Sequence, residues 1–213
     1  MNLKYYYYYF TSALPSRLCD DIVRLGLEGK SEMAIIGGVQ RNSDKFSKKD
    51  LQKLKQKRKS DIVWLNDRWI YKEIQPFINQ ANKEAGWNFD WDWSETSQFT
   101  KYDVGQYYGW HCDSWNKPYD KPDNMDQHGK IRKLSVTVSL SDPEEYDGGN
   151  LEFDTRNHKD WERDKEKSIH ECHEIRPKGS IVVFPSFVWH RVKPVTRGTR
   201  HSLVIWNLGL PWR

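Results

Sequence analysis

The strongest constraint on the fold is a strict two-residue alternation over residues 134–140. Apolar side chains occupy every second position and hydroxyl side chains the positions between: Leu134, Val136, Val138 and Leu140 against Ser135, Thr137 and Ser139. Successive side chains of a β-strand point to opposite faces, so the pattern predicts a strand with one apolar and one polar face.

Comparable short apolar runs, separated by turn residues, fill the chain after residue 95. We expect strands near 98–113, 131–140, 149–154, 172–176, 180–184, 188–193 and 200–207. The segment Asp147–Gly149 has the composition of a turn between two of them. Many short strands with few helices are typical of a sandwich or barrel. The second half of the chain is therefore predicted to be mainly β.

Helical patterns are confined to the first 95 residues. Leu14–Leu25 has the apolar spacing of a helix that covers a sheet, and residues 67–86 carry a second apolar stripe. Pro76 lies inside this second helix and should kink or split it, because proline removes a backbone donor. The aromatic run Tyr5–Phe10 is interpreted as a strand.

The length of 213 residues indicates a single domain spanning 1–213. We expect residues 1–95 to supply helices and strands that support the sheet, and residues 96–210 to form the core. Three cysteines without a paired motif favour reduced thiols and a cytoplasmic setting. Neither a secretory signal nor an 18-residue apolar run is present in the sequence, so membrane spanning is not expected.

The net charge of +4 is too small to argue for nucleic acid as a partner. A local exception is Lys48–Lys59, a lysine-rich run around Leu51 and Leu54. Such a run is most often a solvated helix face or a mobile loop. Contact with a phosphate backbone, or a lid over a site, are the alternatives for this segment.

The first candidate site is the triplet His111–Cys112–Asp113. In extended backbone, residues two apart point the same way, which places an imidazole and a carboxylate on one face. These are two of the three ligands of the facial triad that holds non-haem iron(II). The pair His158 and Asp160 has the same spacing, but it lies in a charged segment without strand alternation, and we expect it to be surface chance.

A second histidine and a conspicuous arginine come from the last 30 residues. His190 follows an apolar strand and a proline-containing turn. Arg200 opens the strand 200–206, where it shares a face with Ser202, Val204 and Trp206. A buried arginine is costly unless an anion meets it. That anion is either a protein carboxylate or a ligand.

The set Tyr102, His111, Asp113, His190 and Arg200, at these spacings, resembles the 2-oxoglutarate- and iron(II)-dependent dioxygenases, in particular the prolyl 4-hydroxylase-like branch. The resemblance runs from about residue 14 to residue 210. It implies a double-stranded β-helix, or jelly roll. It also implies that Fe(II) is held by the two histidines and the aspartate, and that Arg200, assisted by Tyr102, binds the distal carboxylate of 2-oxoglutarate.

The same resemblance implies hydroxylation of a C–H bond, with O2 as co-substrate and 2-oxoglutarate decarboxylated to succinate. Ascorbate is a candidate reductant. A prolyl residue in a peptide or protein is the first candidate substrate, and Arg132, Trp115 and Trp206 are candidate substrate contacts. The alternative interpretation of Arg132 is a surface salt bridge. A free amino acid, another protein side chain, or a metal-inert jelly roll that serves as a binding module remain open.

Overall fold

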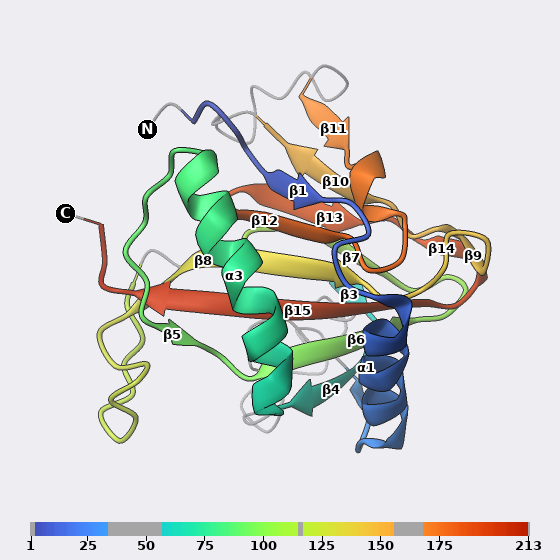
Figure 1. Ribbon diagram of the computed structural model, residues 1–213, viewed down its shortest axis with the longest axis horizontal. Coiled ribbons are helices and arrows are strands. Elements are labelled where there is room, and N and C mark those ends of the chain that lie inside the picture. Colours follow the sequence, from blue (N-terminus) through green and yellow to red (C-terminus); the bar gives the residue numbers. More distant parts are fainter. Residues whose placement is uncertain (1–2, 34–56, 115–116, 156–167, 213) are drawn as a thin grey trace.

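The computed structural model describes residues 3–33, 57–114, 117–155 and 168–212, and these form a mainly β fold. Figure 1 shows the arrangement. The helical elements are α1 (Ser16–Glu28), α3 (Arg68–Glu84) and the short 3-10 turn η3 (His173–Ile175). The strands of the N-terminal part are β1 (Tyr8–Phe10), β2 (Glu32–Met33), β3 (Arg58–Lys59), β4 (Asp61–Leu65) and β5 (Trp93–Ser94).

Ten further strands follow residue 96 in the described part of the chain. They are β6 (Ser97–Tyr102), β7 (Tyr107–His111), β8 (Ile131–Ser139), β9 (Tyr146–Gly148), β10 (Leu151–Asp154), β11 (Ile169–Glu171), β12 (Ile181–Pro185), β13 (Trp189–Val192), β14 (Val195–Gly198) and β15 (Arg200–Gly209). The predicted segment 98–113 is thus two strands. They are separated by a turn at Gly105, whose φ of 79° suits glycine.

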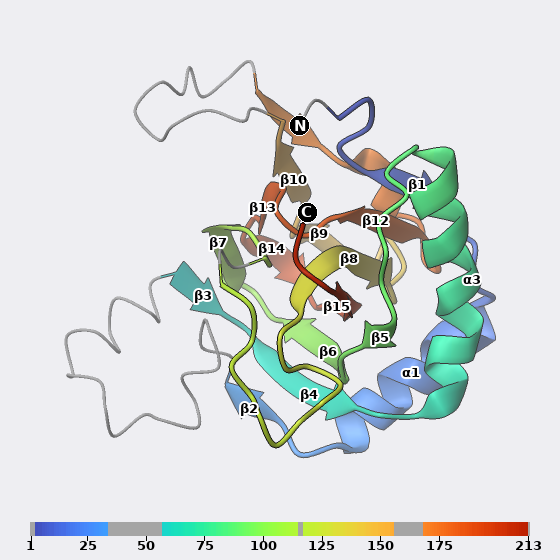
Figure 2. The ribbon, with the colours of Figure 1, turned by 90° about the vertical axis from the view of Figure 1, so that its left-hand side faces the viewer.

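Two antiparallel sheets face each other, which confirms the predicted jelly roll (Figure 2). The larger sheet has the order β1-β12-β8-β15-β6-β4-β2, with β5 paired to β15, and the smaller has the order β11-β10-β13-β7-β3. The turn at Gly105 carries the chain from β6 in the larger sheet to β7 in the smaller. Side chains of both sheets, including Tyr102, Phe153 and Phe184, pack together between them.

The helices α1 and α3 cover the outer face of the larger sheet (Figures 1 and 2). The apolar face of β8 points toward them, so the alternation over 134–140 is confirmed: Leu134, Val136, Val138 and Leu140 belong to this outer core. Its polar face consequently points between the sheets. Pro76 does not split α3, which runs without a break from Arg68 to Glu84.

The strand predicted at 172–176 is wrong. The pairing with β10 ends at Glu171, opposite Glu152, so the strand lies earlier, at 169–171. The N–H of Arg176 then donates to the carbonyl of His173 and closes a turn. Ile175, at the end of this turn, is only 3% exposed and packs in the interior.

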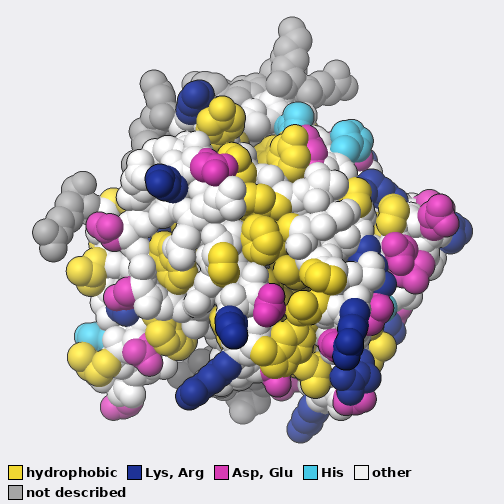
Figure 3. Space-filling view, in the orientation of Figure 1, with side chains coloured by type: hydrophobic (Ala, Val, Ile, Leu, Met, Phe, Trp, Pro, Cys, Tyr) yellow, Lys and Arg dark blue, Asp and Glu magenta, His cyan; other side chains and the backbone are white. Residues whose placement is uncertain are grey.

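The surface above the two helices mixes both signs of charge, with lysine and arginine beside aspartate and glutamate (Figure 3). Among the residues that the structure describes, none of the helices is long and apolar enough to cross a membrane. Most of the run Lys48–Lys59 lies outside the described residues. Arg58, at its end, is not on a solvated helix face, because it belongs to β3 and is buried.

Candidate metal centre

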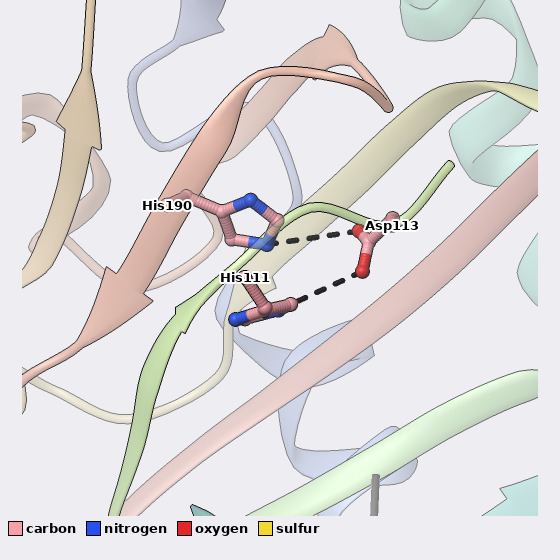
Figure 4. A group of neighbouring side chains, drawn as sticks. All are labelled: His111, Asp113 and His190. Carbon is pink, nitrogen blue, oxygen red and sulfur yellow. Dashed lines mark ion pairs between the residues drawn. The ribbon is translucent and has the colours of Figure 1, made fainter. Parts of the chain in front are cut away.

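Two adjacent strands of the smaller sheet bring His111 and His190 side by side. His111 ends β7 and lies directly opposite His190 in β13. Asp113 follows β7 in a bend, where its backbone N–H donates to the carbonyl of Ser186 (2.8 Å). Figure 4 shows the three side chains pointing toward one another. One donor atom from each lies within 4.8 Å of the others, which makes this a group that could hold a metal ion.

Backbone carbonyls orient both imidazole rings. His111 Nδ1 lies 2.8 Å from the carbonyl oxygen of Gly109, and His190 Nδ1 lies 3.0 Å from that of Val188. A carbonyl only accepts, so each Nδ1 carries the proton and each Nε2 keeps its lone pair. The Nε2 atoms lie 3.6 Å from the two carboxylate oxygens of Asp113. This tautomer and orientation are typical of histidines that bind a metal through Nε2.

The electrostatics keep His111 and Asp113 in the protonation states that a metal requires. Burial lowers the pKa of His111 well below its usual value, and the neighbouring His190 acts in the same direction. For Asp113, burial works to raise the pKa, but attraction from His190, His111 and Arg132 outweighs it and brings the pKa to about 2. Neutral imidazole and ionised carboxylate are the ligating forms, so the donor set fits a divalent cation.

A serine that the sequence did not single out holds the Asp113 carboxylate, and a second serine contacts the first. Ser135 Oγ donates to Asp113 Oδ2 at 2.7 Å, and Ser186 Oγ lies 2.9 Å from Ser135 Oγ. Ser135 lies on the polar face of the alternating strand, and that position is the sequence feature that could have marked it as a site residue. Its partner could not be read from the sequence because the two residues come from different strands and loops.

Aromatic rings pack against both histidines. The ring of Tyr108 stacks on His111, with ring centroids 3.5 Å apart. The Phe184 and Phe153 rings lie 4.7 Å and 6.2 Å from the His190 ring. The donor set therefore faces a low-dielectric interior, where electrostatic interactions are strong.

Arg200 is almost completely buried between the sheets, at 2% exposure. It lies opposite Tyr102 in the register of β15 and β6, and its guanidinium is 5.5 Å from the centre of the Tyr102 ring. Its Nη1 donates to Ser202 Oγ at 3.2 Å. None of the ion pairs among the described residues includes Arg200, so its charge has no carboxylate partner there.

Gly149 provides the space that the Arg200 side chain occupies. A Cβ at this position would lie 2.8 Å from Arg200 Cδ, and the backbone φ of 61° also favours glycine. The predicted turn at 147–149 is present, with positive φ at Gly148 as well. The turn therefore serves the placement of the arginine in addition to reversing the chain.

Arg132 takes part in a partly buried ion pair. Its Nε and Nη2 donate to the two carboxylate oxygens of Glu95, at 3.0 and 2.6 Å, and Tyr119 donates to the same carboxylate at 2.9 Å. The guanidinium also lies 3.9 Å from the centre of the Trp206 ring. The salt-bridge alternative is thus present, although not at the surface, while Trp115, His158 and Asp160 lie outside the described residues.

Comparisons with known proteins show which family has this fold and this set of donors. The profile of the 2OG-Fe(II) oxygenase superfamily matches residues 97–207, slightly more than half of the chain. A PKHD-type hydroxylase of Synechococcus sp. (strain JA-2-3B'a(2-13)) is 35% identical over 106 residues, 49% of this chain and 39% of the relative. The PKHD-type hydroxylase YbiX of Escherichia coli O1:K1 / APEC is 34% identical over 113 residues, 52% of this chain and 42% of the relative.

The chain spans about two fifths of the length of these relatives. Among solved structures, a Pseudomonas putida prolyl-4-hydroxylase superposes with a TM-score of 0.65 at 20% identity, covering 96% of this chain and 93% of that one. The viral collagen prolyl hydroxylase vCPH of Paramecium Bursaria Chlorella virus-1, in complex with 2OG, has a TM-score of 0.63 at 17% identity, covering 97% and 98%. At such identities the likeness concerns the fold.

The fold and the three donors define a jelly-roll protein with a buried group of side chains that could hold a metal ion. The chain belongs to the 2OG-Fe(II) oxygenase superfamily.

Proposed function

We propose that this protein is a 2-oxoglutarate- and Fe(II)-dependent dioxygenase that hydroxylates a C–H bond, with a prolyl residue of a peptide or protein as its first candidate substrate. His111, Asp113 and His190 would hold the iron, and Arg200 with Tyr102 would hold 2-oxoglutarate. The observation that carries the proposal is the combination of a buried three-donor centre with a buried arginine that has no carboxylate partner among the described residues.

The donor set supports Fe(II) rather than a structural metal. Two imidazoles and one carboxylate on one side of a cation leave further coordination positions open, and this set is typical of non-haem iron oxygenases. Structural zinc sites instead close all four positions, usually with thiolates. Cys112 lies between two of the donors, but its Sγ contacts the carbonyl of Ser114 at 3.5 Å and not the centre.

The buried Arg200 supports a dicarboxylic co-substrate. A planar guanidinium binds a carboxylate through paired charge-assisted hydrogen bonds. Tyr102 packs with Phe153 and Phe184 between the sheets, and these rings also contact His190. Arg200 and the metal centre therefore open onto the same interior. A keto acid whose distal carboxylate met Arg200 would extend its other end toward the centre.

The residues of the site would bind and orient the reactants in a dry environment. Bound Fe(II), with 2-oxoglutarate and O2, would supply the oxidising power to break an aliphatic C–H bond, with succinate and CO2 as the products of the keto acid. Ser135 holds the Asp113 carboxylate in place, and the carbonyls of Gly109 and Val188 keep both Nε2 lone pairs available. The rings of Phe153, Phe184 and Tyr108, which pack against the two histidines, would limit the access of water to the centre.

The prolyl substrate is supported by the names of the relatives and of the structural neighbours, which are hydroxylases and prolyl hydroxylases. Trp206 remains a candidate substrate contact: it is only 6% exposed, but it neighbours the Arg132 guanidinium and the ring of Trp64, a residue that is 45% exposed. We propose Arg132 as a residue that positions Trp206, because its Nε and Nη2 are engaged by Glu95. The three free cysteines support a reducing, cytoplasmic setting as part of the proposal.

The test is turnover with Fe(II), 2-oxoglutarate, O2 and ascorbate, with succinate counted and candidate peptides and free amino acids weighed for a gain of one oxygen. The proposal predicts succinate that depends on both Fe(II) and the keto acid, and that Asp113→Ala abolishes. A metal-inert binding module would give no succinate with any substrate.

A further inference from the structure

A second buried arginine lies beside the metal centre, and the proposed function gives it no task. Arg58 in β3 is only 6% exposed. Its guanidinium lies 4.4 Å from the centre of the Tyr108 ring, and its Nε donates to Ser60 Oγ at 3.0 Å. Arg58 is directly opposite Tyr108 in the register of β3 and β7. It therefore lies one strand from the strand that ends at His111.

Tyr108 connects this arginine to the centre. Its ring stacks on the His111 imidazole at 3.5 Å with an interplanar angle of only 10°. The Arg58 guanidinium lies over the same tyrosine ring. Arg58 and His111 thus contact the same tyrosine ring. A group bound by Arg58 would therefore be held near the metal centre, where the C–H bond must react.

The charge of Arg58 is not neutralised by any carboxylate in the part of the chain that the structure describes. None of the ion pairs found there includes it. The Asp113 carboxylate is instead shared by His111 and His190, and Asp61 accepts a hydrogen bond from Gln106. A buried guanidinium without an anion is unfavourable. The burial of Arg58 therefore calls for an anion that the described residues do not supply.

We propose that Arg58 binds a carboxylate group of the primary substrate. The inference rests on the proposed function for the nature of the centre, and it adds a substrate class: molecules whose reacting C–H bond lies close to a carboxylate. Ser60 engages the Nε side of the guanidinium, which leaves the two Nη groups to bind both oxygens of one carboxylate. Arg200 is the separate position for 2-oxoglutarate.

A carboxylate near a prolyl C–H bond has three sources. It can be the α-carboxylate of a free amino acid, the C-terminus of a peptide, or an acidic side chain beside the proline. Matched probe pairs distinguish them: L-proline and L-prolinamide; acetyl-Gly-Pro and its C-terminal amide; acetyl-Glu-Pro-amide and acetyl-Gln-Pro-amide. Within each pair the second member lacks the negative charge and is otherwise close in shape.

Binding of each probe is measured by calorimetry without oxygen, in the presence of Mn(II) and saturating 2-oxoglutarate, so the reading does not depend on turnover. We expect at least one acid to bind about 10- to 100-fold more tightly than its uncharged partner. In Arg58→Gln the acid and its uncharged partner should bind with about equal affinity. Arg24→Gln, a matched change at an exposed arginine with a 62% exposed side chain, should leave it unchanged.

Three results would overturn the proposal. The wild-type protein could bind acids and amides equally in all three pairs. Arg58→Gln could weaken acids and amides equally, which would make Arg58 a support for Tyr108 alone. Arg58→Gln could instead weaken 2-oxoglutarate, which would assign it to the co-substrate. Should Arg58→Gln fail to fold, Ser60→Ala must lower the acid-to-amide ratio, because it removes the partner of Nε.

Failure of the proposed function has a different signature. It would appear as the absence of succinate with every probe in an aerobic assay, whereas the acid-to-amide ratio is a binding measurement and is obtained regardless. The two conclusions can therefore fail separately.

Discussion

Replacing Arg200 by alanine should weaken the binding of 2-oxoglutarate by about 1.5 to 3.5 powers of ten. Arg200 is 2% exposed and has no carboxylate partner among the described residues, so a ligand carboxylate would be buried against it. Removing one partner of such a pair leaves the other charge buried and unpaired, which costs about 2–5 kcal/mol.

The assay is calorimetric titration of 2-oxoglutarate into protein loaded with Mn(II), which avoids turnover. Arg24→Ala, at an exposed arginine on α1, is the control and should bind the keto acid like the wild type. Gly149→Ala gives an independent perturbation, because its Cβ would lie 2.8 Å from Arg200 Cδ. It should weaken 2-oxoglutarate without removing the charge. Unchanged affinity in Arg200→Ala would refute the assignment.

Three further outcomes follow from the structure. Ser135→Ala removes the 2.7 Å hydrogen bond to Asp113 and should lower metal affinity by roughly 10- to 100-fold in a competition titration, as loss of an outer-shell partner does elsewhere; an unchanged dissociation constant would show that the carboxylate needs no support. Asp113→Ala should abolish metal binding in the same titration, whereas Asp160→Ala, at the other His-x-Asp sequence, should bind metal normally. Burial, aided by Lys101, lowers the pKa of His201 to about 4, so the unfolded chain takes up a proton first as the pH falls from about 6.5 to 4 and the free energy of unfolding decreases over that range. In His201→Gln this decrease in the free energy of unfolding should be smaller by roughly 1–2 kcal/mol. Urea unfolding at pH 7 and pH 4.5 measures it, and an equal decrease in the wild type and the variant would contradict the prediction.

Local patterns were sufficient to predict most strands and the shared face of His111 and Asp113. The alternation over 134–140 fixes which face of β8 meets the helices. The positions of His111 and His190 follow from strand ends and turn residues, which are encoded over a few neighbouring positions. Their direct pairing across β7 and β13 is a long-range fact that the resemblance implied and the structure shows.

What could not be predicted depends on partners distant in sequence. Ser135 reaches Asp113 from 22 residues away, and Arg132 reaches Glu95 from 37 residues away. Arg58 was hidden in a basic run whose composition is typical of solvent exposure, and only its pairing with β7 brings it inside. The error at 172–176 has a similar cause, since the end of pairing with β10 decides where that strand stops.

The most direct test of the central claim is a crystal structure of the protein grown with Mn(II) and 2-oxoglutarate, with the metal located by anomalous scattering. Our account predicts a metal peak about 2.1 Å from His111 Nε2, His190 Nε2 and an Asp113 carboxylate oxygen, with the distal carboxylate of 2-oxoglutarate on the Arg200 guanidinium. A metal bound elsewhere, or a keto acid whose distal carboxylate lies away from Arg200, would contradict it.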